Sequence, residues 1–212
     1  YAAANGADIL SMSFGSYSSS IALEQSLGRA YANAVLVAAA GNDFKCIYAH
    51  NCPVNGKSVA QNGPMFPAAF TFVLGVEASD ANGNLASFSN FDEDGPIMST
   101  YSEEQLYNYE LRAPGMSILS TYPGGRYKQL NGTSMACPLV AGAISAMLDR
   151  KEYLSKELLF GDLIHVRLTN TKKPDIVNIF DTYAITDADR QPNLSLVTYH
   201  IADSVAEAVR TA

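Results

Sequence analysis

The sequence predicts an α/β fold whose sheet is mainly parallel. Two continuous apolar runs, at residues 34–42 and 70–78, are typical of parallel strands that are covered on both faces. The segments follow one another as strand, helix, strand, strand, strand and helix, which is the order of an α/β fold. The 212 residues are 48% hydrophobic and 17% charged, so the chain can bury the core of one domain of ordinary size.

The first part of the chain contains a strand, a helix and a second strand. The tail of a helix at residues 1–4 precedes a short apolar strand at residues 7–14. Serines at residues 18–20 can cap a helix over residues 21–33, because a serine hydroxyl accepts an unpaired N–H group of the first turn. The apolar run at residues 34–42 follows and is too short for a helix.

Two more strands and a long helix make up the middle of the chain. The strand at residues 70–78 is closed by the turn signal Asn82-Gly83. A fourth strand is predicted at residues 117–121. The segment around Ser134 then opens a long helix that is small and apolar nearly all round, so we expect this helix to be buried.

The last part of the chain is expected to hold one more helix and a terminal strand. Ser155 can cap the helix, and residues 193–201 alternate like an edge or surface strand. We therefore separate residues 1–188 from a terminal extension, residues 189–212, which could begin a following domain.

Charge and hydropathy exclude two classes of partner. The formal net charge is −7 and no cluster of Lys and Arg is present, which disfavours nucleic acid as a partner. No apolar run reaches 18 residues, so we expect no membrane span. The chain begins at Tyr1 without a visible signal peptide, and we expect it to be a piece of a longer protein.

The three cysteines fall into two groups. Cys46 and Cys52 lie in one loop with five residues between them, a spacing that permits a disulfide and matches no zinc pattern. Both could equally be free thiols in a reducing compartment. Cys137 is expected to be a small buried hydrophobe.

Ser134 lies between a glycine turn and the long helix, in the segment LNGTSMACPLVAGAISAML (residues 130–148). At a helix N-terminus a serine can act as a nucleophile, because unpaired N–H groups and the helix dipole face the negative charge that develops on attack. Gly132 permits the turn, and Pro138 is expected in the first helical turn, where its missing N–H needs no partner. The alternative is that Ser134 only caps a core helix.

Several segments, in this order along residues 1–150, resemble motifs of the subtilisin-like serine peptidases, the subtilases. The resemblance implies a three-layer α/β subtilisin-like fold and serine endopeptidase activity. The segments are GADILSMSFG (residues 6–15), LVAAAGND (residues 36–43), FPAAFTFVLGVEASDANGNLASFSNF (residues 66–91) and LRAPGMSILSTYPGGRYKQLNGTSMACP (residues 111–138).

The resemblance also implies roles for single residues. Ser134 would be the nucleophile, and the Asn42 side-chain amide and the Ser134 backbone N–H would donate to the oxyanion. Polypeptide substrates would bind along two walls beside the nucleophile. The substrate-binding residues would be Ser13, Phe14 and Gly15 on one wall, Ala39, Ala40 and Gly41 around the pocket for P1 (the residue before the scissile bond), and Gly132 and Thr133.

Alternatives remain for two of these residues. Asn42 could simply close a Gly-Asn turn, and Phe14 could be an ordinary core residue. The small residues around the pocket leave room for a large side chain, which favours an apolar or aromatic P1 residue.

The sequence departs from the family pattern in its catalytic triad, which subtilases order as Asp, His and Ser. Neither a D-[ST]-G segment nor an H-G-T-H segment occurs in the 212 residues. His50, His165 and His200 are expected to be structural, and Leu139 stands where the family has a non-triad histidine. We therefore expect an N-terminally truncated fold that is inactive alone. A pseudo-peptidase that binds peptides without cleaving them, and a plain structural domain, are the alternatives.

Further expectations concern metals, location and association. Two segments, residues 46–61 and 92–110, are longer than in compact family members and are expected to be surface loops. Asp92, Glu93 and Asp94 could bind calcium, but their spacing matches no EF-hand loop, so we expect no cofactor and no catalytic metal. The resemblance implies secretion or a cell-envelope location. A truncated sheet should expose apolar surface, so we expect self-association or marginal stability.

Overall fold

The computed structural model describes residues 1–47, 52–54, 57–59, 63–92 and 109–149. The predicted helix at Ser155, the strand at residues 193–201 and the division at residue 188 lie outside the described residues. The elements are η1 (Ala3–Asn5), β1 (Ile9–Met12), α1 (Ile21–Tyr31), β2 (Val35–Ala39), β3 (Cys52–Val54), β4 (Lys57–Val59), β5 (Leu74–Ser79), β6 (Leu111–Pro114), β7 (Ile118–Tyr122), β8 (Arg126–Leu130) and α2 (Thr133–Asp149).

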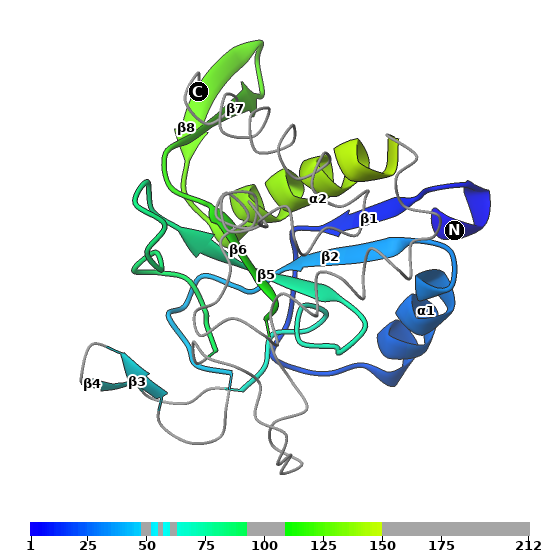
Figure 1. Cartoon of the computed structure of the whole chain (residues 1–212), viewed down its shortest axis with the longest axis horizontal. Helices are drawn as coiled ribbons and strands as arrows, with labels where there is room; N and C mark the ends of the chain where they lie inside the picture. The colour runs from blue at the N-terminus through cyan, green and yellow to red at the C-terminus, as the bar shows by residue number, and fades with distance from the viewer. Residues whose placement is uncertain (48–51, 55–56, 60–62, 93–108, 150–212) are drawn as a thin grey trace, which may run out of the picture.

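The main sheet has four strands in the order β1-β2-β5-β6, and each neighbouring pair is parallel. Each of the five residues of β2 is buried, as a parallel strand covered on both faces requires. The predicted α/β class with a mainly parallel sheet is therefore confirmed (Figure 1).

Helices cover both faces of this sheet. Leu36 and Ala38 of β2 belong to one hydrophobic cluster with Leu27 of α1 and Phe70. Side chains alternate along a strand, so the other buried residues of β2 face the opposite side. There α2 contacts all four strands, and Figure 1 shows it lying next to β1. The arrangement gives the three layers expected.

The two helices begin where the sequence predicts. The Ser20 hydroxyl accepts a hydrogen bond from the N–H of Leu23 at 3.4 Å, which caps α1. α2 begins at Thr133, so Pro138 is the sixth residue of the helix. Our expectation that Pro138 lies in the first turn is wrong, and its missing N–H leaves one carbonyl of the helix without an intrahelical partner.

Several strand bounds differ from the prediction. The third predicted strand begins only at Leu74, because residues 70–73 form turns. The helix tail at residues 1–4 is a single 3₁₀ turn, Ala3–Asn5. The stretch at residues 117–121 does not join the parallel sheet: β7 pairs with β8 as an antiparallel hairpin.

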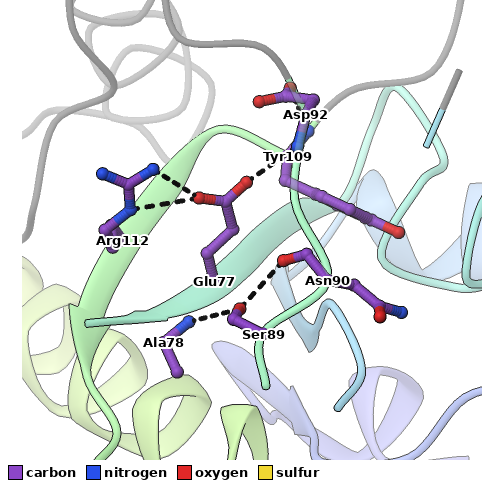
Figure 2. A network of polar contacts seen from close by, with 7 residues as sticks. All are labelled: Glu77, Ala78, Ser89, Asn90, Asp92, Tyr109 and Arg112. Atoms are coloured by element: carbon purple, nitrogen blue, oxygen red, sulfur yellow. Dashed lines mark hydrogen bonds and ion pairs between the residues drawn. The ribbon is translucent and has the colours of Figure 1, made fainter. Parts of the chain in front are cut away.

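The fourth parallel strand is β6, which the sequence did not reveal because it carries a charged residue. Arg112 of β6 lies opposite Glu77 of β5, and their side chains form a buried ion pair at 2.9 Å. Figure 2 shows that Glu77 also accepts the N–H of Asp92 at 3.0 Å, while the Asp92 carboxylate accepts the N–H of Tyr109 at 2.9 Å. The network fixes both residues that flank residues 93–108.

Candidate active site

The candidate site lies where β1, β2 and the N-terminus of α2 meet. Carboxyl ends of parallel strands gather at one edge of a sheet, and this edge is where α/β proteins place their ligands. Ser13 follows β1, Gly41 and Asn42 follow β2, and Ser134 is the second residue of α2. Hydrogen bonds join all three segments here. The structure therefore brings together residues more than 90 positions apart in sequence.

Ser134 is held through its backbone. The Ser13 hydroxyl donates to the carbonyl oxygen of Ser134 at 2.9 Å. In a regular α-helix that carbonyl would accept the N–H of the residue four positions later, which is Pro138 and has none. Pro138 therefore leaves the Ser134 carbonyl free to accept the Ser13 hydroxyl. This hydrogen bond ties the start of α2 to the residue that follows β1.

Ser134 is half-buried, and as the second residue of α2 it does not occupy the capping position before the helix, which was the alternative to a nucleophile. Its hydroxyl donates to the carbonyl oxygen of Ser13 at 3.5 Å, which is a long and weak contact. The hydroxyl is therefore available to another partner.

Asn42 is oriented by Thr133. The Asn42 side-chain oxygen accepts both the backbone N–H of Thr133 at 2.8 Å and its hydroxyl at 3.0 Å. The Thr133 hydroxyl in turn accepts the N–H of Gly41 at 3.1 Å. Because Thr133 binds the oxygen of the Asn42 amide, the two N–H donors of that amide point away from Thr133.

Gly132 places these donors beside Ser134. Its φ of +154° is a conformation that favours glycine. A side-chain carbon added there would meet both the Asn42 amide nitrogen and the backbone nitrogen of Ser134 at 3.6 Å. Two donors from different segments therefore lie near one point beside Gly132, an arrangement suited to a developing oxyanion.

The first predicted wall is exposed. Ser13, Phe14 and Gly15 are all solvent-accessible, and 60% of the Phe14 surface is exposed, so the alternative that Phe14 is a core residue is wrong. The chain then pairs with another segment, since Ser16 and Phe66 exchange two backbone hydrogen bonds of 2.8 Å. An extended substrate can therefore pair with the accessible backbone of residues 13–15, which the Ser16–Phe66 hydrogen bonds hold in place.

The second predicted wall is mostly covered. Ala39 and Ala40 are buried, with 4% and 0% of their surfaces exposed, whereas Gly41 is half-buried. Gly132 and Thr133 are also buried. Of these four buried residues, Thr133 contributes to the site by orienting the Asn42 side chain.

Met65 is a site residue that the sequence analysis missed. Carbon atoms added at Gly15 and Gly41 would each meet the Met65 side chain at 2.8 Å, so this side chain spans the distance between the two predicted walls. Its backbone N–H donates to the buried Tyr109 hydroxyl at 3.1 Å. No local pattern marks Met65, because its contacts come from two distant segments.

The cysteines have separate environments. Cys46 is buried and disulfide-bonded, whereas the side chain of Cys52 lies outside the described residues. Cys137 is a free, buried thiol whose sulfur lies 3.5 Å from the Ser11 hydroxyl oxygen. Burial raises the pKa of Cys137, so it remains a neutral thiol next to the helix start.

The described residues include no histidine and no metal site. His50, His165 and His200 all lie outside the described part of the chain, and so do Glu93 and Asp94. Within that part, no group of three His, Cys, Asp or Glu side chains could hold a metal ion. No helix in it is long and apolar enough to cross a membrane.

Comparison with known proteins points to one family. The Peptidase S8 family, described as the subtilase family, matches residues 1–185. Subtilisin DY of Bacillus licheniformis is 40% identical over 156 residues, 73% of this chain and 47% of that protein. Subtilisin BL of Lederbergia lenta is 36% identical over 151 residues, 71% of this chain and 45% of that protein. The chain spans about half the length of these curated relatives.

One solved structure is also similar to this chain, with a lower sequence identity. The prenylagaramide maturation protease PagA is 30% identical to this chain, with a TM-score of 0.49. The match covers 67% of this chain and 43% of that one.

Proposed function

Because the chain belongs to the subtilase family, we propose that it carries the nucleophile and the oxyanion site of a serine endopeptidase. The observation that supports this most strongly is the Asn42 amide, whose oxygen is held by Thr133 and whose nitrogen lies beside Gly132 and the Ser134 N–H. A turn-closing asparagine would not need this orientation.

In the proposed reaction the Ser134 hydroxyl oxygen attacks the carbonyl carbon of the scissile peptide bond. The resulting oxyanion accepts hydrogen bonds from the Asn42 side-chain amide and the Ser134 backbone N–H. The amine leaves with a proton, and water hydrolyses the acyl-enzyme to release the second product. Substrate-binding residues hold the polypeptide in an extended conformation along Ser13–Gly15.

A base must accept the Ser134 proton, because a serine hydroxyl is a weak nucleophile at its ordinary pKa. The 212 residues contain neither of the family's Asp and His motifs. We therefore expect the 212-residue chain by itself to hydrolyse peptides no faster than its Ser134→Ala variant. A clear rate difference between these two short chains would contradict this expectation.

The test of the proposed function uses the full-length product of the gene and a set of unrelated peptides. We expect cleavage that is lost in Ser134→Ala, and a kcat about 10²–10³-fold lower in Asn42→Ala, the loss measured for the corresponding asparagine of subtilisin. Cleavage that persists in Ser134→Ala would overturn the proposal.

Peptide binding without cleavage is the second candidate. It is favoured by one observation, namely that the Ser134 hydroxyl has only the 3.5 Å contact with Ser13 among the described residues. Saturable binding of peptides by the folded full-length protein, without hydrolysis over days, would establish this alternative.

Location and association complete the proposal. We propose that the protein acts outside the cytoplasm, which the disulfide at Cys46 supports because disulfides persist in oxidising compartments. Cell fractionation tests this. We also propose that the 212-residue chain self-associates, since β1 lies at an edge of the described sheet and Tyr1 and Ile21 are exposed. Sedimentation velocity that shows only monomers would contradict this.

A further inference from the structure

Asn90, which neither forms part of the walls nor touches Ser134, binds the turn that carries Asn42. It lies on the loop after β5 and is buried, with 1% of its surface exposed. Its side-chain oxygen accepts the N–H groups of Asp43 and Lys45, each at 3.0 Å. Its side-chain nitrogen donates to the carbonyl of Ala40 at 2.9 Å and to the Tyr17 hydroxyl at 2.8 Å.

These contacts lie on both sides of the functional pair Gly41-Asn42. One amide holds the residue before the pair, Ala40, and the residue after it, Asp43. The backbone N–H of Asn90 donates to the Gly41 carbonyl at 2.9 Å, which fixes the pair itself. The two donors and two acceptor sites of the amide are all used, so no other side chain of this size offers the same set.

The turn is packed directly on Asn90. Gly41 has a φ of +106°, which favours glycine. A side-chain carbon at Gly41 would also come within 2.4 Å of the Asn90 amide nitrogen, so only a glycine fits between the turn and this amide.

Asn90 is itself anchored to the sheet. Figure 2 shows the Ser89 hydroxyl between β5 and the loop: it accepts the N–H of Ala78 at 2.9 Å and donates to the Asn90 carbonyl at 2.8 Å. On the other side, the Tyr17 hydroxyl donates to the Asp43 carboxylate at 2.6 Å. Burial, and to a smaller extent the hydrogen bond to Asp43, raises the pKa of Tyr17 to about 12. The hydroxyl is therefore protonated at neutral pH.

We propose that Asn90 is a positioning residue for the oxyanion donor Asn42. It holds the Ala40–Asp43 turn so that the Asn42 amide, with its oxygen bound by Thr133, directs a donor into the space beside Ser134. This inference rests on the proposed function. Asn90 is buried and holds the turn rather than the oxyanion itself, so we expect its effect on catalysis to pass mainly through Asn42.

The kinetic test is a double-mutant cycle in the full-length product of the gene, with Asn90→Asp and Asn42→Ala. Asn90→Asp keeps the shape and the acceptors but removes both donors. We expect it to lower kcat by about 10- to 100-fold and to change KM by less than about threefold. In the Asn42→Ala background the same substitution should cost less than about twofold. Equal losses in both backgrounds would overturn the proposal.

Tyr17→Phe is the matched control, because it removes one partner of the amide and the hydrogen bond to the Asp43 carboxylate, but leaves the amide's own hydrogen bonds with Ala40, Asp43 and Lys45. It should change kcat by less than about threefold. Thermal unfolding shows whether each variant is folded. If Asn90→Asp does not fold, Asn90→Ser is judged by the same cycle.

A second readout does not depend on hydrolysis. In protein labelled with ¹⁵N at asparagine, the side-chain signals of Asn42 are identified by their loss in Asn42→Ala. We expect Asn90→Asp, but not Tyr17→Phe, to broaden these signals or speed their exchange with water at least about tenfold. Unchanged signals would overturn the positioning role. A wild-type protein without Ser134-dependent cleavage would overturn the proposed function, and these signals would still decide the role of Asn90.

Discussion

The side-chain oxygen of Asn42 accepts two hydrogen bonds from one residue, Thr133: one from its backbone N–H at 2.8 Å and one from its hydroxyl at 3.0 Å. Thr133 immediately precedes Ser134, so the residue that orients the oxyanion donor is covalently joined to the nucleophile. A shift of α2 would move both together. The relative position of donor and nucleophile is therefore set locally, although the two residues belong to distant parts of the sequence.

Thr133→Val should impair catalysis through Asn42. It removes the hydroxyl that Asn42 accepts and leaves the Gly41 N–H without this acceptor. A hydrogen bond of this kind contributes about 1 kcal/mol, so we expect kcat to fall roughly fivefold to tenfold with little change in KM. Steady-state kinetics on a peptide substrate measures this. Thr133→Ser keeps the hydroxyl and should retain most of the activity; a loss as large as in Thr133→Val would show that the methyl group matters instead.

Ser13→Ala should loosen the start of α2. The Ser13 hydroxyl is the partner that the Ser134 carbonyl has in place of the N–H that Pro138 lacks. We expect kcat/KM to fall about three- to tenfold, because the Ser134 carbonyl loses its donor at the start of α2. Ser11→Ala, two residues earlier and within β1, removes only the 3.5 Å contact with Cys137 and serves as the control. If both variants behave alike, the Ser134 carbonyl bond has no special role.

Met65→Ala should change the preference for the P1 residue. The Met65 side chain spans the distance between Gly15 and Gly41, so its removal opens space between the two walls. We expect kcat/KM for an aromatic P1 residue to rise roughly tenfold relative to alanine, since methylene groups in such sites are worth about 1–3 kcal/mol each. A panel of peptides that differ only at P1 measures the ratio. An unchanged ratio would place the P1 side chain elsewhere.

Glu77→Gln should destabilise the protein without acting on the site. It removes the negative charge that pairs with the buried Arg112 guanidinium, and breaking one side of a buried ion pair costs about 3–5 kcal/mol. Urea unfolding of the full-length product measures this loss. The double variant Glu77→Leu with Arg112→Met removes both charges and should recover most of the stability. A double variant as unstable as Glu77→Gln would mean that the backbone contact with Asp92 is the larger contribution.

Sequence patterns predict an element when its signal is local. The run VLVAA predicts a buried parallel strand, and β2 is one; Ser20 predicts the start of α1, and it caps that helix. The fourth parallel strand escaped prediction because LRAP carries Arg112, whose buried side chain pairs with Glu77 opposite it on another strand. A charged residue in one segment does not indicate which residue of a distant segment will pair with it.

The site divides in the same way. Ser134 and Asn42 belong to motifs that can be read along the chain, and the structure brings the two together. Met65 and Asn90 make contacts with residues tens of positions away. Asn90 lies in the segment at residues 66–91 that resembles a family motif, but that segment does not indicate which residues Asn90 contacts. Their roles depend on how the loops pack on the sheet edge, which the linear sequence does not state.

The central claim is that Ser134 is an activated nucleophile, and covalent labelling tests it most directly. The folded full-length product is treated with a fluorophosphonate, and the adduct is located by intact-protein and peptide mass spectrometry. We predict one adduct per molecule on Ser134, no adduct in Ser134→Ala, and slower labelling in Asn42→Ala. A folded wild-type protein that gains no adduct on Ser134 would contradict the account and make peptide binding without cleavage the better description.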